Sequence, residues 1–274
     1  MTYPLPARLT PSPTEEPQDA WFTVDTLRVH GWVAEPTGTE QDGEVVVLPG
    51  LGLPAYTFPT ALAVAALGWR CTVLDLPGFG VPGADATRPD VHAIGRAAAR
   101  WVRSRPEGRL TLVGHSTAAQ AALSAALDLQ GDRADVSLVM AGPTFTPRQR
   151  RFLPLAGATL TAYRRDSLRE TVILPALARG RVDVARVLRS GMRDRPDERV
   201  RDLAMPLTLT AGEADSYAPR WWLEQLATAA LAAPRVEVEV LPGSHNNLFT
   251  HPERVADTIG RAAARRGLPV LGHG

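Results

Sequence analysis

Apolar residues in this chain come in short runs whose spacing alternates between that of strands and that of helices. Residues 44–48 are β-branched and apolar on both faces, which is typical of a strand buried in the middle of a sheet. Val255, Ile259 and Ala263 instead recur at helical spacing near the end of the chain. Because strands and helices alternate along most of the sequence, we expect a parallel sheet with right-handed crossovers.

The same criteria locate the other elements. Further strands are expected at 21–24, 27–33, 70–76, 110–113, 137–143, 207–211 and 236–241. Helices are expected at 61–68, 91–104, from 118–123 onward, at 221–232 and at 252–266. The first two strands should pair antiparallel around a turn at Asp25 and Thr26.

The pattern changes in residues 144–203, which are arginine-rich, mostly helical in character and broken by prolines, with no convincing strand. We interpret this segment as a helical lid inserted into an α/β core made of residues 20–143 and 204–274. Residues 1–19 are rich in proline and polar residues and should form an N-terminal tail.

Composition narrows the class of protein. The 274 residues are 45% hydrophobic, enough for a substantial core, and the formal charge of +1 gives no net attraction to nucleic acid or an anionic membrane. Cys71 is the single cysteine and lies in an apolar run, so we expect a buried thiol and no intrachain disulfide. No cysteine and histidine cluster has metal spacing, so we expect no metal or other cofactor. Without a signal-peptide pattern or a membrane-length apolar run, a cytoplasmic location is expected.

Residues 114–118 are the most informative stretch. A strand leads into them, a small-residue helix leaves them, and Ser116 stands at the apex. This is the arrangement of a nucleophile elbow, in which the residues two before and two after the serine must be small. Gly114 satisfies this fully and Ala118 does so with one extra methyl group. The alternative interpretation is that Ser116 is an ordinary helix N-cap.

A serine hydroxyl needs a base, and the base works best when a carboxylate orients it. The loop after strand 207–211 carries Asp215, with Glu213 as a rival two residues closer to the strand. The loop after strand 236–241 carries His245. We therefore predict Asp215 and His245 as the partners of Ser116.

The other histidines fit this role less well. His30 and His92 come too early in the chain, His273 lies in the tail, and His251 precedes a proline at a helix start. His115 adjoins the serine, but its side chain should point away across the turn.

A serine nucleophile also requires donors for the oxyanion, usually two backbone N–H groups. We predict one from Thr117, directly after the nucleophile, and one from Leu51, in the loop after strand 44–48. Gly50 and Gly52 allow that loop to turn sharply. The alternative is a simple turn between a strand and a helix.

Together these motifs resemble the α/β-hydrolase superfamily over nearly the whole chain. They occur in the family's order, at residues 49–52, 75–80, 114–116, 212–215 and 243–245. The resemblance implies a mostly parallel central sheet with helices on both faces and a helical lid, and the triad order serine, acid, histidine. It is greatest to small bacterial hydrolases of the carboxylesterase, carbon–carbon hydrolase and haloperoxidase-like group. Two departures are Pro49, where the family usually has histidine, and Ala118, where it usually has glycine.

The resemblance implies a serine hydrolase, most simply one that cleaves a small apolar carboxylic ester through an acyl-enzyme. The same triad could instead cleave a carbon–carbon bond of a diketone-type substrate, with lid arginines binding a carboxylate. A third hypothesis, kept open by Pro49 and Ala118, is a ligand-binding protein with weak catalysis. Ser116 argues against the epoxide hydrolases and dehalogenases that attack with aspartate. Aromatic residues that could line an apolar pocket are Tyr56, Phe145, Tyr163, Trp221 and Phe249.

Overall fold

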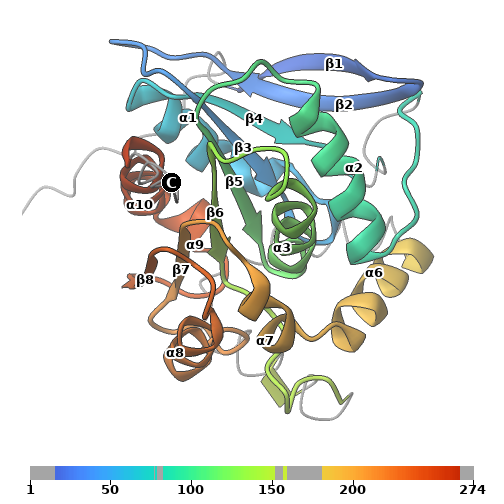
Figure 1. The fold of residues 1–274 in the computed structure, drawn as a ribbon, viewed down its shortest axis with the longest axis vertical. Helices are drawn as coiled ribbons and strands as arrows, with labels where there is room; N and C mark the ends of the chain where they lie inside the picture. The colour runs from blue at the N-terminus through green and yellow to red at the C-terminus, as the bar shows by residue number, and fades with distance from the viewer. Residues whose placement is uncertain (1–15, 77, 79–82, 152–156, 159–180, 266–274) are drawn as a thin grey trace, which may run out of the picture.

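A computed structural model describes residues 16–76, 78, 83–151, 157–158 and 181–265. These residues form an eight-stranded sheet with the order β1-β2-β4-β3-β5-β6-β7-β8 (Figure 1). The strands are β1 Gln18–Val24, β2 Leu27–Ala34, β3 Glu44–Leu48, β4 Arg70–Leu74, β5 Leu110–His115, β6 Val136–Ala141, β7 Leu207–Gly212 and β8 Val236–Leu241. The hairpin β1–β2 is antiparallel, β2 joins β4 antiparallel, and the other neighbours pair in parallel. The expected mostly parallel sheet is confirmed.

Helices cover both faces of this sheet (Figure 1). The described α-helices are α1 Phe58–Ala66, α2 Val91–Arg103, α3 Thr117–Leu129, α6 Arg181–Arg193, α7 Pro196–Arg199, α8 Arg220–Ala229, α9 Asn247–Thr250 and α10 Pro252–Ala264. Short 3-10 turns occur at η1 Gly50–Gly52, η2 Ala55–Thr57 and η4 Val200–Asp202. Within the described ranges, no helix combines the length and apolar character needed to cross a membrane.

The central strand β3 shows why both faces must be covered. Val45 and Val47 pack in one buried cluster together with apolar residues of α1 and α10. Val46 and Leu48 pack in the other, together with residues of α2, α3 and α8. Successive side chains of a strand point to opposite faces, so an uninterrupted apolar run requires two cores. Cys71 is buried in the first of these clusters, as expected.

The N-terminal boundary differs slightly from the sequence prediction. Strand β1 begins at Gln18, so the last residues of the predicted tail 1–19 already pair with β2. Asp25 in the intervening turn has a positive φ of 55°, a conformation that aspartate tolerates better than most residues. Residues 1–15 lie outside the described residues.

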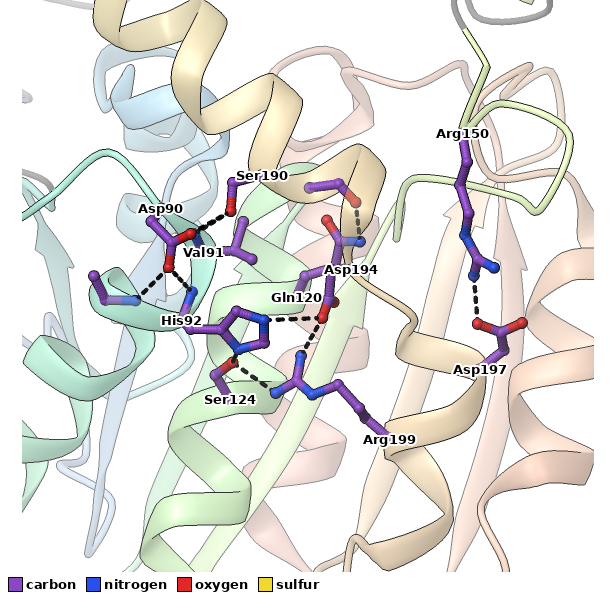
Figure 2. Close-up of polar contacts among 12 residues, drawn as sticks. Asp90, Val91, His92, Gln120, Ser124, Arg150, Ser190, Asp194, Asp197 and Arg199 are labelled. Carbon is purple, nitrogen blue, oxygen red and sulfur yellow. Dashed lines mark hydrogen bonds and ion pairs between the residues drawn. The ribbon is translucent and has the colours of Figure 1, made fainter.

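The predicted lid, residues 144–203, is described only in part, and its central stretch lies outside the described residues. Its C-terminal portion contains α6 and α7, and α6 is joined to the start of α2 (Figure 2). Ser190 donates to Asp90 Oδ2 at 2.9 Å and accepts from the backbone N–H of Val91 at 3.0 Å. The other oxygen of Asp90 caps α2 by accepting from the N–H groups of His92 and Ala93. One carboxylate therefore both starts a core helix and holds α6.

A second polar cluster ties the end of α6 to α3 (Figure 2). Asp194, almost fully buried, accepts from Arg199 at 2.8 Å and lies 3.3 Å from His92 Nε2. The same guanidinium donates to Ser124 Oγ of α3 at 2.6 Å. Gln120, also on α3, donates to the Gly191 carbonyl at 3.0 Å. The described end of residues 144–203 is thus fixed to the core by specific polar contacts.

Candidate active site

The turn between β5 and α3 presents Ser116 in a strained backbone conformation, with φ 57° and ψ −126°. Its tightness accounts for Gly114, because a Cβ there would lie 2.4 Å from the carbonyl oxygen of Ala118 and 2.6 Å from Cβ of Ala122. Ala118 itself is 6% exposed and packs in the larger core cluster. The elbow thus excludes a side chain at position 114 and accommodates a methyl group at position 118.

The structure brings Ser116, His245 and Asp215 together. His245 Nε2 lies 2.9 Å from Ser116 Oγ, and His245 Nδ1 lies 2.9 Å from Asp215 Oδ2. The three residues follow β5, β8 and β7, respectively, which run parallel in one sheet. Because the carboxyl ends of parallel strands meet at the same edge, residues about 130 positions apart come within hydrogen-bond reach.

Asp215 is the carboxylate that faces His245, whereas its rival Glu213 is exposed. Burial alone would raise the pKa of Asp215. That effect is outweighed by His245 and by the N–H groups of Ala218 and Tyr217, which lower the pKa below its usual value. Asp215 Oδ1 accepts from these two N–H groups at 2.9 and 2.8 Å. The carboxylate is thus ionised at neutral pH and held in one orientation.

Gly142, just beyond β6, packs against His245 and Asp215. Its φ is 54°, and a Cβ at this position would lie 3.2 Å from the His245 ring and 3.3 Å from Asp215 Oδ2. A side chain at position 142 would therefore strain the backbone and would also crowd the imidazole and the carboxylate.

The two predicted oxyanion residues also lie together. Leu51 adopts a left-handed conformation, φ 53° and ψ 17°, and its N–H donates to Thr117 Oγ1 at 3.1 Å. A Cβ on Gly50 would lie 2.9 Å from Cβ of Ser116, so this loop packs directly against the elbow. Sequence reasoning considered only the backbone N–H of Thr117 and missed this contact of its hydroxyl.

Sequence reasoning also missed the contacts of Tyr56 and His115. His115 is buried, its ring centre is 5.0 Å from that of His245, and its Nδ1 lies 2.6 Å from the Tyr56 hydroxyl. These two residues are 59 positions apart, and no local pattern links them. The sequence analysis expected the His115 side chain to point away across the turn and considered Tyr56 only as an aromatic residue that could line a pocket.

The aromatic residues that could line an apolar pocket differ in burial, and Tyr56 and Phe249 are partly buried. Phe145 is 1% exposed and belongs to the buried interior, whereas Trp221 is 49% exposed. Tyr163 lies outside the described residues. Tyr217 also lies beside the site, and its ring centre is 4.7 Å from that of His245. Across the described ranges, no group of three or more histidine, cysteine or carboxylate side chains is arranged to hold a metal.

Solved structures share this fold at low sequence identity. A lipase-esterase related protein from Clostridium acetobutylicum has a TM-score of 0.68 and 12% identity, covering 85% of this chain and 99% of that chain. A soluble variant of monoglyceride lipase from Saccharomyces cerevisiae has a TM-score of 0.64 and 15% identity, covering 96% and 100%. The epoxide hydrolase VrEH1 from Vigna radiata has a TM-score of 0.66 and 15% identity, covering 91% and 98%. Their stated activities differ, so the likeness concerns the fold.

Comparison with curated protein sequences gives no match. The family comparison is specific, because residues 45–258 match the model described as the alpha/beta hydrolase family. The match spans residues 49–52, the turn at Ser116 and the loops that carry Asp215 and His245. This chain belongs to the alpha/beta hydrolase family.

Proposed function

We propose that the protein is a serine hydrolase that cleaves small carboxylic esters through an acyl-enzyme. The observation that carries the proposal is the continuous row of hydrogen bonds from Ser116 through His245 to Asp215, each 2.9 Å long. A serine beside an imidazole that a buried carboxylate orients is the arrangement that activates a hydroxyl for attack on an acyl carbon.

In the first half of the reaction, Ser116 Oγ attacks the ester carbonyl while His245 Nε2 takes the hydroxyl proton. Asp215 accepts from Nδ1–H and stabilises the imidazolium that forms. The tetrahedral intermediate collapses, the ester C–O bond breaks, and His245 returns the proton to the leaving alkoxide. The acyl group is left on Ser116.

In the second half, His245 takes a proton from water, which attacks the acyl carbon. Collapse of the second intermediate releases the carboxylic acid and returns the proton to Ser116. The backbone N–H groups of Thr117 and Leu51 stabilise the oxyanion in both halves. The Leu51 N–H, which donates to the Thr117 hydroxyl in this structure, would then be shared with the oxyanion.

The proposal extends to the substrate and the lid. The ring of Tyr217 beside His245 supports a substrate with an apolar acyl or alcohol group. Residues 144–203 are proposed as the cover of the site, and the contacts of Asp90 with Ser190 and of Asp194 with Arg199 support a fixed position for its C-terminal end.

The direct test is covalent labelling with a fluorophosphonate probe, followed by mapping of the modified peptide. We expect wild-type protein to be labelled at Ser116 and the Ser116→Ala variant to remain unlabelled. Folded wild-type protein that does not react would contradict the proposal and favour a ligand-binding role. If labelling succeeds, p-nitrophenyl esters of increasing chain length should be turned over faster than a ring-fission diketone.

A further inference from the structure

A second row of hydrogen bonds does not involve the Ser116 hydroxyl. It links residues 49–52, which carry the proposed oxyanion donor Leu51 and which we call the oxyanion loop, to the loop of His245. The backbone N–H of Gly50 donates to the Tyr56 hydroxyl at 2.7 Å, and that hydroxyl lies 2.6 Å from His115 Nδ1. On the other side of the ring, His115 Nε2 lies 2.9 Å from the backbone carbonyl oxygen of His245. We call these four residues the rear chain.

The partners at its two ends fix every proton in the rear chain. The carbonyl of His245 can only accept, so His115 Nε2 must carry a hydrogen. A neutral imidazole then has a lone pair on Nδ1, which accepts the O–H of Tyr56. The Tyr56 oxygen is in turn free to accept from Gly50. Each donor therefore faces an acceptor in a single consistent assignment.

This assignment requires a neutral His115. Burial, and secondly the charge of His245, lower the pKa of His115 to about 3. Burial of the hydroxyl raises the pKa of Tyr56, although the residue as a whole is only partly buried. Both side chains thus keep their protons in place throughout the neutral pH range. A neutral His115 also adds no repulsion when His245 becomes an imidazolium 5.0 Å away.

We propose that Tyr56 and His115 are positioning residues that hold the oxyanion loop and the His245 loop in register with each other. This inference rests on the proposed function. Neither residue is placed to touch the reacting atoms: Tyr56 acts through the backbone of Gly50, next to Leu51, and His115 acts through the backbone of His245. Catalytic groups must be held within about 0.5 Å of their productive geometry, so loosening either loop slows the reaction.

Three substitutions cut the rear chain at different points. Tyr56→Phe removes the acceptor for Gly50 and the donor to His115. His115→Asn keeps an acceptor near the Nδ1 position but loses the donor to His245. His115→Gln keeps a donor near the Nε2 position but loses the acceptor for Tyr56. We expect Tyr56→Phe and His115→Asn each to lower kcat for a p-nitrophenyl ester by about tenfold or more, while KM changes less than about threefold.

Two comparisons separate positioning from a general loss of stability. Because both cuts break the same chain, the double variant Tyr56→Phe/His115→Asn should be little slower than either single variant, not slower by the product of the two effects. His115→Gln cuts the same chain between Tyr56 and His115, so it should be slowed about as much as the other two variants. As a control, His30→Gln replaces another buried histidine, bonded to Asp19 and remote in the sheet order from β5. It should lower the Tm without lowering kcat per folded molecule.

The outcomes for the two proposals differ. If wild-type protein reacts with fluorophosphonate but Tyr56→Phe and His115→Asn keep wild-type kcat, the rear chain has no positioning role and the serine hydrolase proposal stands. The inference is equally overturned if both variants lose activity only in proportion to their unfolded fraction. If wild-type protein itself does not react, the proposed function fails, and the inference fails with it.

Discussion

Acidification should destabilise this protein partly through His115, and replacing that residue should remove this part of the effect. Burial of the imidazole, together with the charge of the neighbouring His245, lowers the pKa of His115 from an ordinary value of 6.5 to about 3. Between these values the unfolded chain binds a proton that the folded protein does not, so acid favours unfolding. The contribution of neutral His115 to the free energy of unfolding is fully present above about pH 6.5 and declines as the pH falls toward about 3.

The size of the effect follows from the shift. Each pKa unit corresponds to about 1.4 kcal/mol, so titration of an unfolded-state histidine with a pKa of 6.5 costs about 2 kcal/mol between roughly pH 7 and pH 5. Further acidification to about pH 4 brings the cost to about 3 kcal/mol. Such a loss is a large fraction of the stability of an ordinary domain.

Urea denaturation at several pH values between about 7 and 5 measures this directly. His115→Gln cannot titrate, so its free energy of unfolding should fall by about 2 kcal/mol less than that of wild type over this range. Ser116→Ala leaves His115 and its partners in place and should keep the wild-type pH dependence. Parallel curves for wild type and His115→Gln would refute the assignment of a neutral, buried His115.

Other substitutions test the elbow, the carboxylate and the attachment of α6. Gly114→Ala should lower the free energy of unfolding by about 1–3 kcal/mol in urea titrations, because the new Cβ would lie 2.4 Å from the Ala118 carbonyl oxygen. Asp215→Asn should lower kcat for an ester by about 10⁴-fold while the protein stays folded, since the amide favours the wrong His245 tautomer; near-normal kcat would exclude its role. Ser190→Ala should lower the free energy of unfolding by about 1 kcal/mol. An unchanged Tm would show that the contacts of Ser190 do not stabilise α6.

Local patterns in the sequence were sufficient to locate most of the core. The uninterrupted apolar residues of β3 indicated burial on both faces, and the small residues around Ser116 indicated a tight strand-to-helix turn. Asp215 and His245 could be selected because each follows a recognisable strand. In these cases the position of each candidate residue in the fold is set by its immediate neighbours in the chain.

Contacts between distant segments could not be predicted in this way. Tyr56 lies in a short 3-10 turn, and nothing in its spacing indicates that it meets His115 or the N–H of Gly50. The bond between Leu51 and the Thr117 hydroxyl likewise depends on how a loop packs against the elbow. Such contacts arise from the relative placement of whole elements, which a single sequence does not encode in any short pattern.

The most direct test of the central claim compares ester hydrolysis by wild-type protein and the Ser116→Ala variant at equal concentrations of folded protein. Because Ser116 Oγ is the proposed nucleophile, its removal should lower kcat/KM for a p-nitrophenyl ester by at least about 10³-fold, with the Tm little changed. A folded Ser116→Ala protein that hydrolyses the ester at the wild-type rate would contradict the account.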